Sequence, residues 1–510
     1  MKIKFLIIGS TLAVFLGCSS LSHEERAPAS LLTLSCASFF GGKDRSKAYT
    51  KLEKSQEEFW PKFREKSPFT SWMAGLKLGE ITWGITTEAD RKNEIAKYEA
   101  ELAKINRIGS KAMSKEEQVE FDLYKDLLTK TLMGLKSDLW YLRIDHMTGD
   151  IKTMMDTVFS LPFRNIEDYQ NWNLFLAQIP NHLQNLKTVL RTGIKKGIVH
   201  PQLIVDKALG QVDALLNSDV AKNNLFNPYL QPKISSSELG SLKAQASQMI
   251  TGEVATALKD FKLFLQNEYY PHARKTLGIS SLPHGKKLYQ DIIYMQTDLR
   301  MDPASIHKIG LAELARIDRE FDKVRVQLKF TGSLEEFKAS VPHNKAYFFK
   351  TSDQIVQSYN EMVTRIWKVV PKYFGLIPKA KLEVRPVPDS SAPFNPSAYY
   401  TRPTADGSQP GIYFINTYQP ETRIATTLEN LTIHEAIPGH HFQISLNMEI
   451  PDSSIFRRES LYGSTSFIEG WALYAEYLGE EMGFYKDPVM KLGRLSDDAL
   501  RAARLVVDTG

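Results

Sequence analysis

The chain has 510 residues, of which 43% are hydrophobic and 11% aromatic, so it can bury a large core without help from disulfides or structural metals. Its formal net charge of +5 comes from acidic and basic residues that are mixed along the chain, without a basic run of the kind that follows a phosphate backbone. We therefore predict a globular protein with no nucleic-acid partner.

The start of the chain has the pattern of an export signal. A short basic segment precedes an apolar stretch that is too short to cross a bilayer, so residues 1–17 are predicted to be a signal peptide. Cys18 follows in a setting that resembles a bacterial lipobox, in which the cysteine carries lipid; plain cleavage near this point is the alternative. We expect residues 18–45 to be a lipid anchor and linker that tie the exported protein to the cell envelope, facing the periplasm or on the outer membrane if the cell is Gram-negative. Cys36 would then be left without an internal disulfide partner.

Helical periodicity dominates residues 46–375. Apolar residues recur every three or four positions in segments such as 88–108 and 236–269. Ser114 and Glu117 have the spacing of a capping box at the start of a further helix. The sequence therefore predicts a mainly α fold.

Strand signals are few and precede the most informative motif. Residues 381–388 and 411–417 are short β-type runs, and residues 399–410 between them are rich in the Pro, Asp and Gly that turns require. We predict a small β-sheet beside the helices, within a catalytic region over residues 376–510 that forms one continuous body with residues 46–375.

The motif HEAIPGHH at residues 434–441 combines a His-Glu pair with two further His. Zinc peptidases usually carry two His ligands four residues apart on one helix, with a Glu that faces the bound water. The preceding residues 419–433 are predicted to be a helix that continues into His434. In an unbroken helix His440 would be rotated by roughly 120° from His434, and His441 would lie about 10 Å along the axis. A regular helix therefore cannot build the site.

Pro438 changes this geometry because it cannot donate a hydrogen bond to the carbonyl of His434 and its ring collides with that carbonyl. Gly439 adds backbone freedom. If these two residues loop out as a bulge, the usual zinc-peptidase spacing returns with His440 as the second ligand. His441 is the alternative second ligand.

The remaining site residues are acidic. Glu435 is predicted to be the general base. Residues 466–483 are predicted to be a helix on which Glu469 and Glu476 lie nearly on one face among aromatic side chains, where a carboxylate is costly unless it meets a cation. We predict Glu469 as the third ligand, with a surface or salt-bridge role as the alternative, and Glu476 as the acceptor of the distal N–H of a ligand His.

These strings resemble a bacterial family catalogued as domain of unknown function 885. Its hallmarks stand in this chain as HEAIPGHH and EGWALYAE, and the strings YYPHARKTLG and RAARLVVDTG are also similar. Members are often exported or lipoprotein-anchored and are predicted zinc metallopeptidases, distantly akin to helical carboxypeptidases and oligopeptidases of the gluzincin type. Because members usually continue further, we expect a truncated C-terminus.

The resemblance implies a large helical zincin-like body with one Zn²⁺ per chain, held by His434, His440 and Glu469, with Glu435 as the base. We therefore expect a zinc-dependent metallopeptidase that hydrolyses short peptides. A metal-dependent hydrolase of another amide, such as a cell-wall peptide, and a non-catalytic lipoprotein that binds peptide or metal are the alternatives.

Two further features are expected to serve the substrate. The strand over residues 411–417 is predicted either to pair with an extended peptide as an edge strand or to be an ordinary core strand. Chemistry suggests four candidate donors to the oxyanion of the reaction, each of which could equally be structural: Tyr399, Tyr400, Tyr462 and Arg504.

Overall fold

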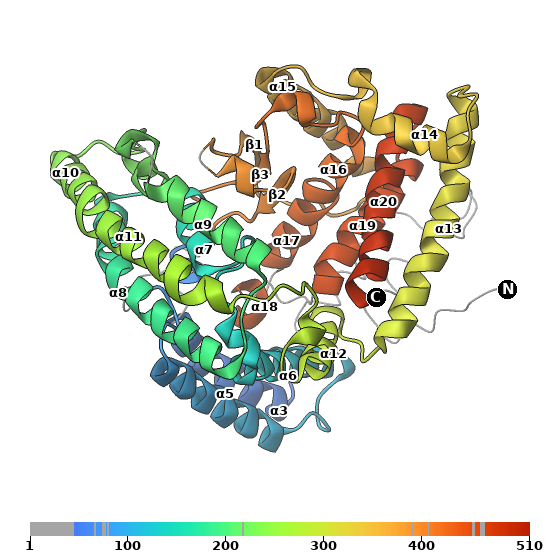
Figure 1. Ribbon diagram of the computed structural model, residues 1–510. Helices are drawn as coiled ribbons and strands as arrows, with labels where there is room; N and C mark the ends of the chain where they lie inside the picture. The colour runs from blue at the N-terminus through green and yellow to red at the C-terminus, as the bar shows by residue number, and fades with distance from the viewer. Residues whose placement is uncertain are drawn as a thin grey trace. The chain divides into compact units, whose positions relative to one another are not determined.

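The computed structural model describes residues 45–65, 68–73, 78, 81–216, 219–389, 391–405, 407–450, 454–459 and 465–510 (Figure 1). Ser46–Gly510 form one compact unit. The expected signal peptide, Cys18, Cys36 and Tyr462 lie outside the described residues. Helices dominate the described part of the chain, where the strands form one small sheet, so the prediction of a mainly α fold is confirmed.

The first helices are α3 (Lys47–Glu65), α4 (Pro68–Met73), α5 (Glu88–Ile108) and α6 (Lys115–Lys136). α3, α5 and α6 pack around an aromatic core, whereas Trp72 of α4 belongs to the larger core of the helices that follow. The predicted capping box of Ser114 and Glu117 starts α6, and Thr87 with Asp90 forms a second one at the start of α5. Trp60 and Tyr124 are fully buried in the aromatic core of α3, α5 and α6.

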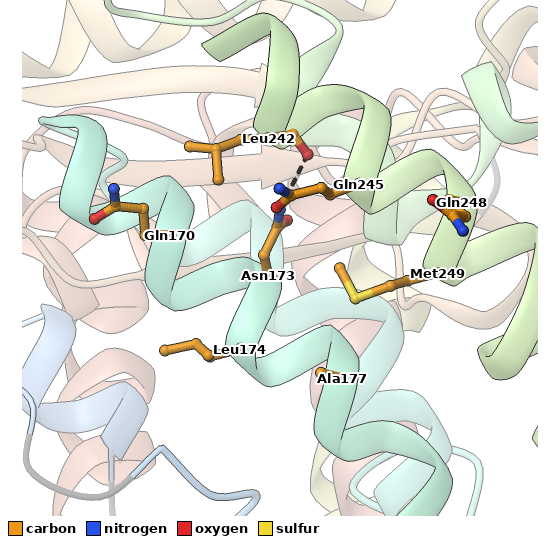
Figure 2. Close-up of a pocket in the computed structure, with 8 residues that line it drawn as sticks. All are labelled: Gln170, Asn173, Leu174, Ala177, Leu242, Gln245, Gln248 and Met249. Atoms are coloured by element: carbon orange, nitrogen blue, oxygen red, sulfur yellow. Dashed lines mark hydrogen bonds between the residues drawn. The ribbon is translucent and has the colours of Figure 1, made fainter. Parts of the chain in front are cut away.

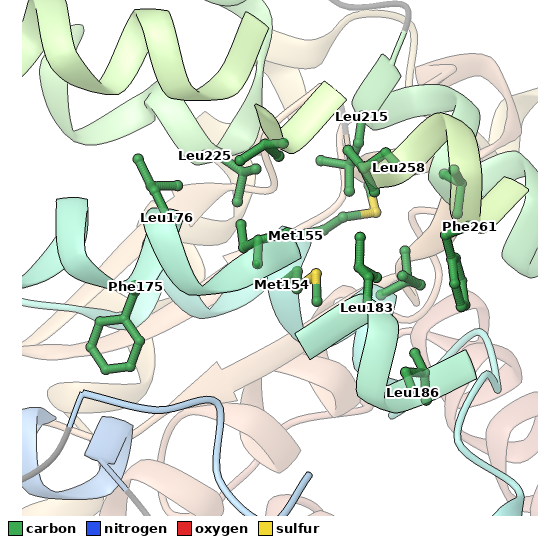
Figure 3. Packing of buried hydrophobic residues seen from close by; sticks show 14 of the residues in the cluster. Met154, Met155, Phe175, Leu176, Leu183, Leu186, Leu215, Leu225, Leu258 and Phe261 are labelled. Atoms are coloured by element: carbon green, nitrogen blue, oxygen red, sulfur yellow. The ribbon is translucent and has the colours of Figure 1, made fainter. Parts of the chain in front are cut away.

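The next helices surround the largest apolar core of the described residues (Figure 3). They are α7 (Asp150–Ser160), α8 (Ile166–Lys196), α9 (Gln202–Leu216), α10 (Leu239–Met249) and α11 (Ala255–Phe264). Two π-helical turns, Ile250–Val254 and Leu265–Tyr269, interrupt the helix predicted over residues 236–269. Met154, Phe175 and Phe261 are among the buried side chains.

A surface groove lies between α8 and α10 (Figure 2). None of the predicted site residues lines this groove, so it is separate from the predicted chemistry. Its walls combine apolar and amide side chains: Gln170, Asn173, Leu174, Ala177, Leu242, Gln245, Gln248 and Met249.

The later helices are α12 (Gly285–Thr297), α13 (Pro303–Gln327), α14 (Leu334–Ser340), α15 (Ser352–Trp367) and α20 (Pro488–Thr509). α12, α13 and α14 contact α20, whereas α15 packs beside the sheet and α16 (Leu428–Glu435). α13 lies along α20 (Figure 1). A Cβ at Gly310 would lie 2.8 Å from Val506 Cγ2, so the absence of a side chain lets these two helices approach closely.

The sheet contains β1 (Leu382–Pro386), β2 (Ala398–Thr401) and β3 (Gly411–Ile415) in the order β1-β3-β2. β3 pairs in parallel with β1 and antiparallel with β2. Of the two alternatives predicted for this strand, the core strand is confirmed and the edge strand is wrong, because β3 is central and all five of its residues are buried. Most of β2 falls within the predicted turn over residues 399–410. Pairing with β3 stabilises the extended backbone there.

The motif region contains α16 (Leu428–Glu435), α17 (His440–Glu449), α18 (Ile455–Glu459) and α19 (Thr465–Glu481). The predicted helix over residues 419–433 begins only at Leu428. The backbone before it bonds elsewhere, because Phe349 N donates to Arg423 O and Ala425 N donates to Tyr347 O. No helix in the described part of the chain combines the length and apolar character that a membrane span requires.

Candidate metal centre

The break between α16 and α17 brings the two motif halves together. Four residues, 436–439, separate the helices, where a two-residue bulge is predicted. The Ile437–Pro438 peptide bond is cis, and Pro438 O accepts a hydrogen bond from Trp471 Nε1 on α19 at 2.8 Å. A Cβ at Gly439 would lie 1.8 Å from His434 O, so only glycine lets the chain pass this carbonyl.

His434, His440 and Glu469 converge at this break. His434 Nε2 lies 3.3 Å from Glu469 Oε2, and His440 Nε2 lies 3.6 Å from Glu469 Oε1. One donor atom from each of the three residues lies within 4.8 Å of the other two, and no other group of His, Cys, Asp and Glu among the described residues meets this criterion. The structure therefore brings the three predicted ligands together.

The donor set fits zinc. Ligand atoms that each lie about 2.0–2.1 Å from a tetrahedral ion are roughly 3.3 Å apart, close to the separations of the carboxylate from the two imidazoles. Two imidazoles and one carboxylate are also the donors of several catalytic zinc sites, in which the fourth position is open to water.

The exposure of the acidic residues differs from the prediction. Both carboxylates are predicted to be buried among aromatic residues. The side chain of Glu469 is instead 50% exposed, whereas that of Glu476 is buried, with 1% exposed. His434 and His440 are buried, so solvent reaches the candidate centre from the side on which the carboxylate of Glu469 is exposed.

Glu476 contacts the ring nitrogen of His434 that does not face Glu469. Its Oε1 lies 2.7 Å from His434 Nδ1, in the geometry predicted for the acceptor of a ligand's distal N–H. The guanidinium of Arg501 on α20 donates to both oxygens of Glu476. Sequence reasoning missed Arg501 and selected Arg504 from the same segment, because only the packing of α20 shows which arginine faces α19.

The charges around the centre favour a cation. Burial alone would lower the pKa of His434, but its hydrogen bonds to Glu469 and Glu476 outweigh burial and raise the pKa to about 9. Burial and the neighbouring His434 lower the pKa of His440 to about 4. Burial raises the pKa of Glu435 to about 7, although the charge of His434 acts in the opposite direction. Without an ion, a proton on His434 therefore supplies the positive charge that the surrounding carboxylates require.

His441 belongs to a different network. Its Nδ1 lies 2.9 Å from Tyr400 Oη and its Nε2 lies 3.1 Å from Ala380 O. A Cβ at Gly411 would lie 2.6 Å from His441 Nδ1, so the imidazole packs directly on β3. The structure thus places His440 in the centre and directs His441 towards the sheet, where it also engages the Tyr400 hydroxyl.

The other candidate oxyanion donors do not reach the centre in the described residues. Tyr399 stacks on Phe414 at 4.9 Å between ring centroids and packs against the small apolar cluster around it, on the face of the sheet opposite Tyr400. Arg504 is exposed and makes no hydrogen bond with the ligand residues of the described chain. The structure thus brings none of the candidates among the described residues into contact with the three ligands.

Comparison with known proteins identifies the family. The model of a family described as bacterial protein of unknown function (DUF885) matches residues 68–510. The chain belongs to the DUF885 family. Both hallmark strings of the predicted site fall inside this range, as do the three candidate ligands. No curated protein matches the sequence.

Two solved structures share the fold of this DUF885 chain. A predicted lipoprotein from Colwellia psychrerythraea aligns with a TM-score of 0.80 and 22% identity, over 91% of this chain and 83% of that chain. A predicted lipoprotein of unknown function from Shewanella oneidensis aligns with a TM-score of 0.61 and 18% identity, over 89% of this chain and 82% of that chain. At these identities the likeness is one of fold.

Proposed function

We propose that this DUF885 protein is a zinc-dependent metallopeptidase that hydrolyses short peptides. The observation that carries the proposal is the convergence of His434 Nε2, His440 Nε2 and a Glu469 oxygen beside the buried Glu435. The resemblance to helical oligopeptidases and carboxypeptidases supports short peptides as the substrate class.

Zinc in this position would polarise the scissile carbonyl and lower the pKa of an attacking water towards about 7. Glu435 follows a ligand directly in α16 and is buried. Its burial and its position next to a candidate ligand suit a group that accepts a proton from water and then donates it to the leaving amine. Glu476 would keep the proton of His434 on Nδ1, which leaves Nε2 as the donor atom.

The outer edge of β2 is the candidate docking site for the peptide backbone. β2 pairs with β3 on one side, and Tyr400 on β2 bonds to His441 at the start of α17. An extended peptide that adds to the other side of β2 would continue the sheet next to the helices that carry the ligands. We propose β2 for this role in place of β3.

The proposed location is the cell envelope. The predicted lipobox at Cys18 and the names of the two structurally similar proteins, both predicted lipoproteins, support an exported protein that lipid anchors to the membrane. Labelling of the chain with a radioactive fatty acid, with Cys18→Ala as the control, tests this location.

Peptide cleavage tests the proposed activity. The zinc-loaded protein is incubated with a mixed-length peptide library and, in a second arm, with cell-wall muropeptides, and the products are mapped by mass spectrometry. We expect the wild type to cut peptides and the isosteric variant Glu435→Gln to bind zinc but lose at least about 10²-fold in kcat.

The cut positions distinguish trimming of ends from internal cleavage. Cleavage of muropeptides alone would move the substrate to another amide. No cleavage of either substrate by a protein with one zinc per chain would contradict the proposal of a hydrolase and favour a binding role.

A further inference from the structure

Arg501 on α20 reaches the candidate metal centre through Glu476. Its Nη2 donates to Glu476 Oε1 at 2.8 Å, and its Nη1 donates to Glu476 Oε2 at 3.2 Å. The same Oε1 lies 2.7 Å from His434 Nδ1. A continuous chain of hydrogen bonds therefore runs from Arg501 to a candidate zinc ligand.

Glu476 occupies a place where a carboxylate needs a cation. Its side chain is almost fully buried, and its negative charge acts on three further carboxyl groups, those of Glu435, Asp497 and Asp498. A buried charge among like charges is costly unless an opposite charge and hydrogen bonds satisfy it. The planar guanidinium of Arg501 supplies both, because its two parallel N–H groups match the two carboxylate oxygens.

The two parallel N–H groups of Arg501 also fix the orientation of the Glu476 carboxylate. With both oxygens of Glu476 held by Arg501, the carboxylate resists rotation and Oε1 stays against His434 Nδ1. The Nδ1 proton then remains between these two residues, and His434 Nε2 faces Glu469. Partners outside the ligand set control the tautomer and the ring orientation of metal-bound histidines in this way.

We propose that Arg501 is a positioning residue of the metal centre, which orients Glu476 so that His434 presents Nε2 to the zinc ion. This inference rests on the proposed zinc site. It assigns α20, which contributes no ligand itself, a direct part in metal affinity.

A purely structural role for Arg501 predicts a different result. If the ion pair only joined α20 to α19, its loss would lower the stability of the protein and leave the zinc affinity of the folded protein unchanged. Zinc affinity, measured below the unfolding temperature of each variant, separates the two roles.

The test compares zinc affinities of the full chain by competition with a chelating dye. We expect Arg501→Met to weaken zinc binding by about 10- to 100-fold, the range seen when such supporting partners are removed. Arg501→Lys keeps the charge but lacks the two parallel N–H donors, so we expect an intermediate loss of zinc affinity. Arg504→Met is the matched control, one turn further along the same helix and exposed, and should bind zinc like the wild type.

A double-mutant cycle with Glu476→Gln identifies the route of the effect. If Arg501 acts through Glu476, Arg501→Met should cause little further loss of zinc affinity in the Glu476→Gln background. The nitrogen chemical shifts of His434 give a second readout when they are followed by NMR without zinc as the pH is raised until the imidazole is neutral, because Arg501→Met should then redistribute the remaining ring proton between Nδ1 and Nε2. If Arg501→Met does not fold, Arg501→Lys, which keeps the positive charge beside Glu476, carries the zinc titration.

The outcomes separate this inference from the proposed function. Zinc bound at one per chain by the wild type, with the same affinity in Arg501→Met, would overturn the role of Arg501 and leave the metallopeptidase proposal standing. A wild type that binds no zinc would overturn the proposed function itself. Equal losses in Arg501→Met and Arg504→Met would also overturn the inference, since the effect would then lack a specific route.

Discussion

Two adjacent histidines end the motif, and their contacts separate their roles. His440 directs Nε2 to Glu469, whereas His441 uses both ring nitrogens for Tyr400 and Ala380. The pattern HH alone leaves both residues as possible ligands. The direction of each imidazole depends on where α17 begins, which the break before it determines.

His440→Ala should lose zinc binding, whereas His441→Ala should retain one zinc per chain. Removal of His441 leaves buried polar partners unpaired, so we expect a loss of about 1–3 kcal/mol in the free energy of unfolding. Zinc stoichiometry by atomic spectroscopy and chemical denaturation measure the two effects. Loss of zinc from His441→Ala with retention in His440→Ala would reverse the assignment of the second ligand.

Zinc affinity should depend on pH through His434. Because the pKa of His434 is about 9 without an ion, the metal must displace a proton at neutral pH. The apparent dissociation constant should therefore rise about tenfold for each pH unit below 9, and His440, with a pKa of about 4, adds nothing until the solution is strongly acidic.

Competition titrations between about pH 6 and pH 8 measure this slope. Glu476→Gln is an informative comparison, since a neutral amide holds the His434 proton less firmly and should flatten the dependence. An affinity that does not change with pH in the wild type would contradict the charge balance described for the centre.

At the scale of the element, the break at residues 436–439 sets the geometry. Pro438 predicts an interruption of the helix, but the residues involved extend beyond the predicted bulge to Ala436, whose N–H still bonds to Thr432 O. Trp471 on α19 bonds to Pro438 O, so the path of the break depends on a helix distant in sequence. The local sequence therefore predicts that the helix is interrupted, whereas packing against α19 determines the backbone path of the interruption.

Gly439→Ala should disrupt the break, because the new Cβ would lie 1.8 Å from His434 O and 2.3 Å from Ile433 O. Backbone atoms cannot move aside cheaply, so we expect a loss of about 3 kcal/mol in unfolding free energy together with weaker zinc binding. Gly134→Ala in α6 is the control, since nothing lies within 4 Å of its Cβ position, and it should stabilise the protein by about 0.5–1 kcal/mol. Equal behaviour of both variants in denaturation would contradict the close approach.

The sheet shows where strand prediction from local sequence fails. Residues 381–388 and 411–417 are predicted as strands and contain β1 and β3, but β2 lies in a segment with turn composition. The backbone of β2 pairs with β3, and Tyr400 bonds to His441, so tertiary contacts overcome a weak local preference. The same contacts place β3 at the centre of the sheet.

At the scale of the whole molecule, α18 links the neighbourhood of the candidate metal centre to the first helices. Phe456 on α18 is fully buried in the aromatic core of α3, α5 and α6, 5.1 Å from Tyr124 and 6.1 Å from Trp60 by ring centroids. α18 lies in the chain between α17, which carries His440, and α19, which carries Glu469. Contacts between α18 and α3 therefore tie α18, which lies between two candidate ligands in the chain, to the first helices.

Phe456→Ala should lower the free energy of unfolding by about 3–5 kcal/mol, as expected for a large buried aromatic side chain. Because the connection between α17 and α19 loses its anchor, zinc affinity should also fall. Leu263→Ala is the control, since that side chain is 56% exposed on α11 and should affect neither quantity much. Destabilisation of Phe456→Ala with unchanged zinc affinity would show that α18 does not restrain the centre.

The sequence by itself determined the mainly helical fold, and it limited the candidate site to His434, Glu435 and Glu469 with either His440 or His441, because these follow from periodicity, from donor chemistry and from a helix breaker within the motif. Tertiary structure decided what depends on packing between distant elements. It separated His440 from His441, placed Arg501 rather than Arg504 behind Glu476, exposed Glu469 and made β3 central. Spacing along a chain reports which side chains share a face of one element, whereas these outcomes depend on which faces of different elements meet.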